Sequence, residues 1–296
     1  MHYTGTIWRP PYEAESLLLQ ATAGCTHHNC KFCTLYHDLP FPFRMSPMEE
    51  VEADIEEAAP AGKLFGWKRV FLTGANPFVL KPERLLAIAG QIHQKLPAVQ
   101  TIGCFARITD IALKTGDELE QLRRMGYDGL TIGMETGDEE ALRFMRKGYG
   151  AADILEQAKR LEQAGISYRV FYLTGISGAG RGQEGARRTA EVLNQLQPVG
   201  VGANMLTVYR NSDLYQDILR GAWQEEEELE KYRELYTLVE GLTIPVEFMA
   251  LGASNAFQLQ GVLPEERDAL LRTLNQIITQ GSEETLRTYR EQLPHL

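Results

Sequence analysis

Three of the four cysteines of this 296-residue chain, Cys25, Cys30 and Cys33, lie close together on one short stretch. Thiolate sulfur is a soft ligand that favours zinc, copper(I) or iron–sulfur clusters, and three thiolates on one loop can converge on one corner of a cluster. A fourth coordination position is then left for a ligand other than cysteine. The C-x4-C-x2-C spacing therefore predicts a metallocofactor site with one open position.

Two other interpretations use the same cysteines. A zinc site would add His27 or His28, although structural zinc usually joins two separate ligand pairs and the chain has no second C-x2-C or H-x3-H pair. A disulfide would need an oxidising compartment. Residues 1–11 lack the apolar core of a secretory signal, so the sequence predicts the reducing cytoplasm, where disulfides are rare.

Composition favours an enzyme acting on a small molecule or a peptide. The chain is 44% hydrophobic and long enough to bury a large core, and no apolar run is long enough to span a bilayer. A net charge of −10 argues against broad capture of nucleic acid. The acidic run 225–228 is predicted to be the solvated face of a helix.

The elements that must position the cysteines alternate between apolar strands and amphipathic helices. Strands are expected at 16–23, 69–73, 101–105, 129–134, 168–174, 201–208 and 246–251. Helices are expected near 48–59, 82–96, 117–125, 151–164, 183–195 and 229–240.

A repeated strand–helix order implies parallel strands joined by right-handed crossovers. Six or seven such units predict an α/β fold, a full or partial TIM-like barrel with a mostly helical C-terminal extension. We expect an N-terminal arm at 1–15, the barrel core at 16–221 and the extension at 222–296.

In such a barrel the functional loops follow the carboxyl ends of the strands. The cysteine loop follows the first expected strand, and residues 73–77 follow the second. Glu135 follows the fourth strand, and the glycine-rich segment 175–185 follows the fifth. These loops are therefore expected to meet on one face.

The cysteine spacing, with Phe32 before the last cysteine, resembles the radical S-adenosylmethionine (SAM) superfamily over about residues 17–214. The similarity is to the oxygen-independent coproporphyrinogen oxidases and the Elp3- and MiaB-type cores, whose commoner first gap has three residues instead of four. It implies that Cys25, Cys30 and Cys33 bind a [4Fe–4S] cluster whose fourth iron is chelated by SAM. Phe32 then packs near the cluster, and its backbone contacts adenine.

The same resemblance assigns SAM contacts to the other loops. Gly74, Ala75 and Asn76 stand where the family usually has a Gly-Gly-Glu-Pro loop that accepts hydrogen bonds from the SAM ammonium, with Asn76 lacking the family's charge. Alternatively, these residues form a plain Asn-Pro turn at a strand end.

Three more positions match family contacts to SAM. Glu135 would bind the ribose hydroxyls, Lys147 the carboxylate, and Ile176 would back the adenine ring. Lys147 could also be an ordinary solvated lysine at a helix end. The loop containing Ile176 resembles a phosphate loop but lacks its Lys-Ser/Thr pair, so no nucleotide is assigned to it.

The expected reaction is reductive cleavage of SAM to a 5′-deoxyadenosyl radical, which removes a hydrogen atom from a small substrate. The family implies a flavodoxin- or ferredoxin-type reductant. Only Cys104 remains outside the loop, so cysteines alone cannot hold a second cluster. An iron–sulfur electron carrier or redox sensor without SAM chemistry, and a zinc-stabilised interaction module, are the alternatives.

Overall fold

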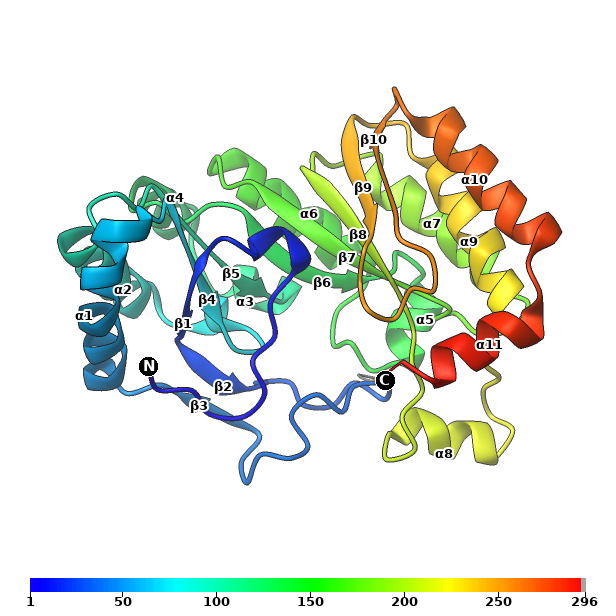
Figure 1. The fold of residues 1–296 in the computed structure, drawn as a ribbon, viewed down its shortest axis with the longest axis horizontal. Coiled ribbons are helices and arrows are strands. Elements are labelled where there is room, and N and C mark those ends of the chain that lie inside the picture. The colour runs from blue at the N-terminus through cyan, green and yellow to red at the C-terminus, as the bar shows by residue number, and fades with distance from the viewer. Residues whose placement is uncertain (294–296) are drawn as a thin grey trace. The chain divides into compact units, whose positions relative to one another are not determined.

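The computed structural model describes residues 1–293 as an α/β protein. Its strands are β1 (Leu17–Gln20), β2 (Thr22–Gly24), β3 (Phe43–Met45), β4 (Arg69–Thr73), β5 (Thr101–Ala106), β6 (Leu130–Glu135), β7 (Tyr168–Thr174), β8 (Gly200–Met205), β9 (Val246–Ala250) and β10 (Leu259–Leu263). Its α-helices are α1 (Met48–Phe65), α2 (Pro82–Lys95), α3 (Ile108–Ala112), α4 (Gly116–Arg124), α5 (Glu139–Phe144), α6 (Ala151–Gln163), α7 (Gly182–Leu193), α8 (Asp213–Leu219), α9 (Glu228–Gly241), α10 (Arg267–Gln280) and α11 (Glu283–Glu291). The main sheet has the strand order β1-β4-β5-β6-β7-β8-β9-β10 (Figure 1).

The chain forms two compact units. The first comprises residues 1–28, 35–133 and 157–168. In it β1, β4, β5 and β6 pair in parallel, whereas β2 and β3 form a separate antiparallel pair. Helices α1 and α2 pack side by side in this unit (Figure 1). Strand β4 is buried almost throughout, as expected of a parallel strand covered on both faces.

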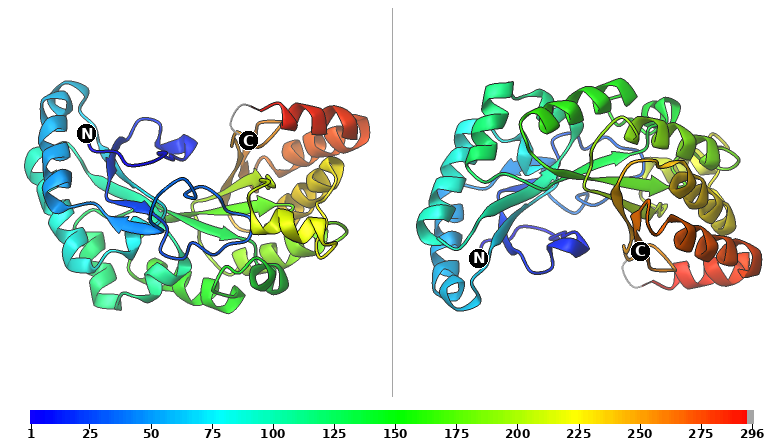
Figure 2. Two further views of the ribbon diagram at one scale, coloured as in Figure 1. Left: turned by 90° about the horizontal axis from the view of Figure 1, so that it is seen from below. Right: turned by 90° about the horizontal axis from the view of Figure 1, so that it is seen from above.

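The second unit comprises residues 29–34, 134–156 and 169–296. Strands β7, β8 and β9 pair in parallel, and β10 pairs antiparallel with β9. Helix α9 packs against both α7 and α10. In Figure 1 and Figure 2 these three helices lie side by side along one side of the unit's strands, whereas α8 lies apart from them.

The predicted α/β class, with the mostly parallel sheet of a partial TIM-like barrel, is confirmed. Several details differ. The expected strand at 16–23 is two strands, because β1 pairs with β4 and β2 turns away to pair with β3. Strands β3 and β10 and the short helices α3, α5 and α8 were not expected.

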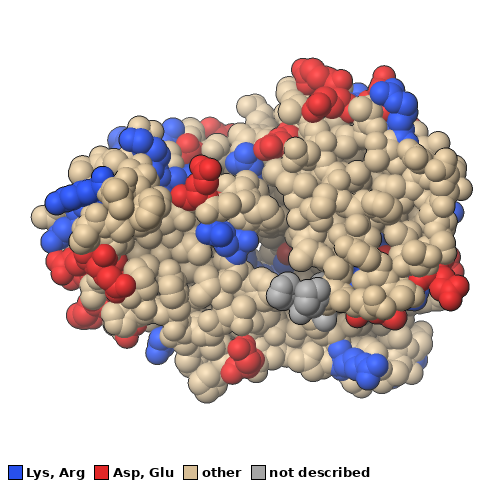
Figure 3. Space-filling view, viewed as in Figure 1, with Lys and Arg blue, Asp and Glu red and all other residues tan. Residues whose placement is uncertain are grey.

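No helix among the described residues is long and apolar enough to cross a membrane. On the face shown in Figure 3, basic and acidic side chains occur in small mixed groups. That face therefore presents no extended basic area.

Candidate functional site

The first cysteine follows the end of β2, where the backbone is closely packed. Gly24 has a φ of 76°, and a Cβ there would lie 2.2 Å from the carbonyl oxygen of Pro42. The amide of Cys25 donates to that same oxygen at 2.8 Å. Only glycine fits this approach, so the pairing of β2 with β3 fixes where the cysteine loop begins.

The loop after β4 lies directly against β2. Gly74 has a φ of 121°, and a Cβ on it would meet Thr22 Oγ1 at 2.2 Å and the Thr22 carbonyl oxygen at 2.3 Å. Ala75 follows as a half-buried residue, and Asn76 is fully buried at the start of the short 3₁₀ turn Pro77–Val79. The glycine is what allows this loop to approach the strand that leads into the cysteines.

The side chain of Asn76 is fully engaged within the first unit. Its Nδ2 donates to Thr26 Oγ1 at 2.8 Å and to both carboxylate oxygens of Asp110 at 3.1 Å. Its Oδ1 accepts from the amide of Thr26 at 3.3 Å. Because a carboxylate can only accept, Asp110 fixes which end of the Asn76 amide faces it.

Asp110 itself is buried in α3. Its Oδ2 accepts a hydrogen bond at 2.8 Å from the amide of Arg107, the residue that caps the start of α3. Burial raises the pKa of Asp110 to about 6, and the hydrogen bonds from Arg107 and Asn76 oppose that rise. The carboxyl group of Asp110 therefore lies next to Asn76, the residue that stands where the family motif usually has a glutamate.

Behind this network lie a lysine and the fourth cysteine. Lys114 donates to the carbonyl oxygens of Phe78 and Asp110, and its Nζ lies 4.4 Å from the centroid of the Phe78 ring. Burial lowers the pKa of Lys114 to about 8. Cys104 is completely buried, and burial raises the pKa of its thiol. That environment suits an inert packing thiol rather than a reactive one.

The other two cysteines of the loop belong to the second unit, where Lys31 between them is held by four contacts. Its amide donates to the carbonyl of Met145 at 3.2 Å, and its own carbonyl accepts from the amide of Leu214 at 2.9 Å. Its Nζ pairs with Asp217 at 2.7 Å and lies 3.7 Å from the centroid of the Phe144 ring. The segment Cys30–Cys33 is therefore anchored on both sides of its backbone.

Phe32 packs against a buried apolar cluster of this unit. The cluster consists of Met145, Ile176, Leu206 and Leu214. Phe32 and Ile176, for which the resemblance implied roles near adenine, therefore belong to one apolar assembly. Their contact with a ligand stays a prediction.

Glu135 and Lys147 form an ion pair at 3.0 Å. The Lys147 side chain is only 6% exposed, so it is not a solvated helix-end lysine, and its Nζ lies 5.7 Å from the centroid of the Phe32 ring. Glu135 has a φ of 67°, an uncommon conformation for a residue with a side chain. Such strain at the end of a strand is frequent where a side chain must be aimed at a ligand.

Most backbone amides of the glycine-rich loop after β7 are engaged in hydrogen bonds within the protein and so are not available to a phosphate group. The amides of Gly175, Ile176, Gly178, Ala179, Gly180 and Arg181 all donate to protein acceptors. Among them, Gly175 donates to Glu234 at 2.8 Å and Ala179 to the carbonyl of Gln224 at 2.9 Å. This agrees with the absence of the lysine and hydroxyl pair that a phosphate loop requires.

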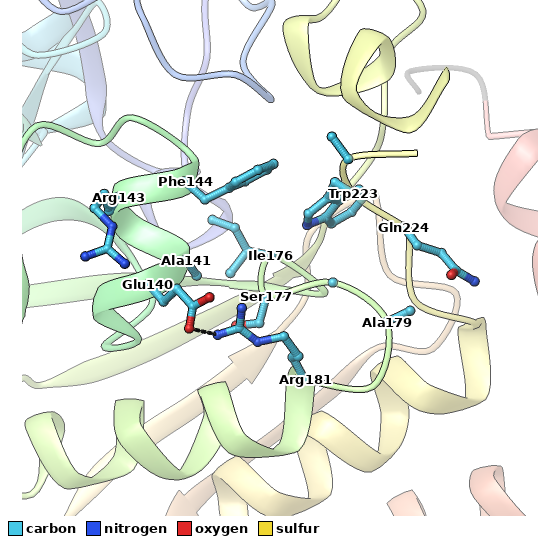
Figure 4. A pocket seen from close by; sticks show the side chains of 12 residues that line it. Glu140, Ala141, Arg143, Phe144, Ile176, Ser177, Ala179, Arg181, Trp223 and Gln224 are labelled. Atoms are coloured by element: carbon cyan, nitrogen blue, oxygen red, sulfur yellow. Dashed lines mark hydrogen bonds and ion pairs between the residues drawn. The ribbon is translucent and has the colours of Figure 1, made fainter. Parts of the chain in front are cut away.

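The same loop lines a cavity of about 390 Å³ in the second unit (Figure 4). Phe144 and Trp223 point toward one another above Ile176, and an ion pair between Glu140 and Arg181, at 2.7 Å, lies at one side. Aromatic walls over an apolar floor suit a flat ring.

Beneath this loop lies a pair of buried carboxyl groups that the sequence did not reveal. Glu226 and Glu234 are both fully buried, and Glu234 accepts from the hydroxyl of Tyr172. Burial and the neighbouring Glu234 raise the pKa of Glu226 to about 11, so Glu226 is protonated at neutral pH. The prediction that 225–228 is a solvated helix face is therefore wrong, because Glu226 and Glu228 face inward and helix α9 begins only at Glu228.

The chemistry of the cysteine loop fits an iron–sulfur cluster. Cys25, Cys30 and Cys33 are partly exposed and no disulfide joins them, whereas Cys104 is buried. Within residues 1–293 no group of three or more His, Cys, Asp or Glu side chains is already arranged as a metal site. The fit therefore rests on the donor set, three partly exposed cysteine sulfurs on one loop.

Sequence reasoning missed Asp110, Lys31 and Glu234, whose roles come from contacts between distant parts of the chain. Lys31 offered one signal, its place between two candidate metal ligands. For Glu234 the pattern gave no signal, because a glutamate in an amphipathic helix is ordinarily solvated.

Comparison with known proteins gives the family. The model of the radical SAM superfamily matches residues 19–184, more than half of the chain. No curated protein matches.

Solved structures show the same fold. The radical SAM methyltransferase TsrM from Kitasatospora setae has a TM-score of 0.57 at 17% identity, covering 70% of this chain and 39% of that one. Coproporphyrinogen III oxidase (HemN) from Escherichia coli has a TM-score of 0.59 at 16% identity, covering 76% and 51%. Methylornithine synthase (PylB) has a TM-score of 0.54 at 17% identity, covering 92% and 85%.

This chain thus spans well under two thirds of the methyltransferase and the oxidase, but most of the synthase. The TsrM structure holds a [4Fe–4S] cluster. The chain belongs to the radical SAM superfamily, whose cofactors are a [4Fe–4S] cluster and SAM.

Proposed function

We propose that this enzyme cleaves SAM reductively to methionine and a 5′-deoxyadenosyl radical, and that the radical removes a hydrogen atom from a small substrate. The observation that carries the proposal is the set of three partly exposed cysteines, joined by no disulfide, on one loop of a radical SAM chain. Cys25, Cys30 and Cys33 would hold the cluster, which supplies the electron for the cleavage. The protein supplies orientation and exclusion of water.

Glu135 and Lys147 are proposed to hold the ribose and the carboxylate of SAM. Their buried ion pair supports this, because each charge is kept in place and largely dehydrated before a ligand arrives. Binding of SAM would exchange the partner of Lys147 from Glu135 to the ligand carboxylate. Glu135 would then be released to accept hydrogen bonds from the two ribose hydroxyls.

The remaining contacts follow from how the loops are built. Both polar atoms of the Asn76 side chain already form hydrogen bonds within the protein. The backbone carbonyls around Gly74 and Ala75 are therefore the proposed acceptors for the SAM ammonium. Phe32 and Ile176 would pack near the adenine. The apolar cluster they join supports that role, since it keeps both side chains fixed.

For partners, we propose a small-molecule or peptide substrate and a flavodoxin- or ferredoxin-type reductant in the cytoplasm. The net charge of −10, and the mixed charges on the face in Figure 3, support a partner other than nucleic acid.

Anaerobic reconstitution with iron and sulfide, followed by dithionite and SAM, tests the proposal. The expected product is 5′-deoxyadenosine. Cys25→Ser should abolish it, whereas Cys104→Ser, which changes a cysteine outside the loop, should leave it. A fully loaded cluster that yields no 5′-deoxyadenosine would favour an electron carrier or redox sensor, and uptake of zinc without a brown chromophore would favour an interaction module.

The substrate class has its own test. The reconstituted enzyme is incubated with extracts of cells grown in deuterated medium, and the mass of the 5′-deoxyadenosine is measured. A small substrate predicts that deuterium is transferred from the fraction that passes a small-pore filter. Transfer from the retained macromolecules alone would refute that part of the proposal.

A further inference from the structure

Two departures from the family pattern meet at one buried group. The first cysteine gap has one extra residue, and the loop after β4 carries Asn76 in place of an acid. Asn76 is completely buried, and its amide contacts Thr26, the residue that follows Cys25 and opens the lengthened gap. Asn76, which replaces the family's acid, therefore holds the start of the lengthened cysteine gap at Thr26.

Asp110 explains why position 76 carries an amide. Both of its carboxylate oxygens lie 3.1 Å from Asn76 Nδ2, and one accepts a further hydrogen bond from the Arg107 amide. A carboxylate at position 76 would stand about 3 Å from this one, where two such groups cannot both be ionised. An amide instead donates to Asp110 and still accepts from the Thr26 amide.

We propose that Asn76 and Asp110 form a latch that positions the Cys25 end of the cysteine loop through Thr26, and that position 76 must be an amide because position 110 is a carboxylate. Both are positioning residues, because their hydrogen bonds reach the cysteine loop through Thr26. The latch holds Thr26 at two points, its amide and its hydroxyl. The neighbouring amide of Cys25 is held separately by Pro42, so the start of the lengthened gap is fixed on both sides.

This inference rests on the proposed function only in that the loop binds a cluster, and it does not depend on SAM cleavage. Groups that orient the ligands of a metal site typically change its affinity by about 10- to 100-fold when they are altered. Loss of the latch should therefore appear as faster loss of iron, whether or not SAM is present.

The experiment measures the rate at which a chelator removes iron from the reconstituted protein. Asn76→Asp should raise the rate about tenfold or more, because it places two carboxylates in contact. The double variant Asn76→Asp with Asp110→Asn reverses the polarity of the pair. Each contact keeps one donor and one acceptor, because the Thr26 hydroxyl, which accepts from Asn76, can donate to an aspartate at that position. The double variant should return to within about twofold of the wild-type rate. In the iron-free protein, hydrogen exchange of the Thr26 amide should quicken in the single variant and slow again in the double variant.

Glu13→Gln is the matched control for general destabilisation. Glu13 is buried in the same unit and accepts from Arg69 at 2.7 Å, away from the cysteine loop. It should lower the stability of the unit without changing iron loss. A double variant that loses iron as fast as Asn76→Asp, or an Asn76→Asp protein that loses iron at the wild-type rate, would overturn the latch. A wild-type protein that holds no cluster would instead overturn the proposed function.

Discussion

Replacing Glu226 with glutamine should remove much of the loss of stability that this protein suffers as pH rises. Glu226 lies fully buried beside Glu234, and the attraction of Lys231 offsets only part of the rise in its pKa that burial and Glu234 cause. With its pKa raised to about 11, the folded protein keeps a proton on Glu226 that the unfolded chain releases above about pH 4.3.

The magnitude follows from proton linkage. Between the two pKa values the folded state binds one more proton than the unfolded state. The free energy of unfolding therefore falls by about 1.4 kcal/mol for each pH unit. The stabilising contribution is complete below the unfolded pKa and is lost steadily as pH rises toward the folded one. From pH 6 to pH 8 the loss due to this carboxyl group is about 2.7 kcal/mol. Glutamine donates to Glu234 without a titrating proton, so this part of the slope should vanish in Glu226→Gln.

Urea unfolding at pH 6, 7 and 8 measures the slope. Trp223 lies in the same unit as the pair, so its fluorescence reports on that unit once Trp8→Phe and Trp67→Phe remove the other two tryptophans. Glu227→Gln makes the same chemical change at an exposed neighbour and should keep the wild-type slope. If Glu226→Gln also kept that slope, the carboxyl group would be ionised in the folded protein and the reasoning would fail.

Two further predictions concern residues that are proposed to hold SAM. Gly74→Ala should lower the free energy of unfolding by roughly 1–3 kcal/mol, since the new Cβ would meet Thr22 Oγ1 at 2.2 Å. Gly90→Ala, at an open helical position, should raise it by about 0.5–1 kcal/mol, and equal effects in urea titrations would contradict the packing. Lys147→Met should cost about 3 kcal/mol by stranding the Glu135 charge. Adding Glu135→Gln should recover most of that stability, yet SAM binding by equilibrium dialysis should stay weak; a double variant that binds SAM normally would remove both residues from the site.

Much of the fold was predictable because the signals are local. The strands at 69–73 and 168–174 have the predicted bounds, since each is a short apolar run bounded by clear breaks. Strand β10 escaped prediction because its residue types do not follow its alternating burial: Gly261 is buried whereas the apolar Val262 is exposed.

The latch and the buried acids could not be predicted, because their meaning depends on distant partners. Asn76 contacts Thr26 and Asp110, which lie 50 and 34 residues away along the chain. Glu226 looks like any acid in a charged run until the neighbouring Gly182 is seen to leave room for it, with a Cβ there falling 2.1 Å from Glu226 Oε1. A pattern of residue types does not contain such distances.

The extensive hydrogen bonding of the loop at 175–181 has a consequence for how tightly a ligand could bind against it. Ordering a flexible backbone costs about 1–2 kcal/mol of conformational entropy for each residue. In a mobile loop this cost reduces the free energy of ligand binding. Here the amides already donate to Glu234, to Gln224 and to the loop itself, so the conformational entropy has been lost during folding. Binding energy gained on this surface is therefore retained as affinity, and ligand exchange need not wait for the loop to reorganise.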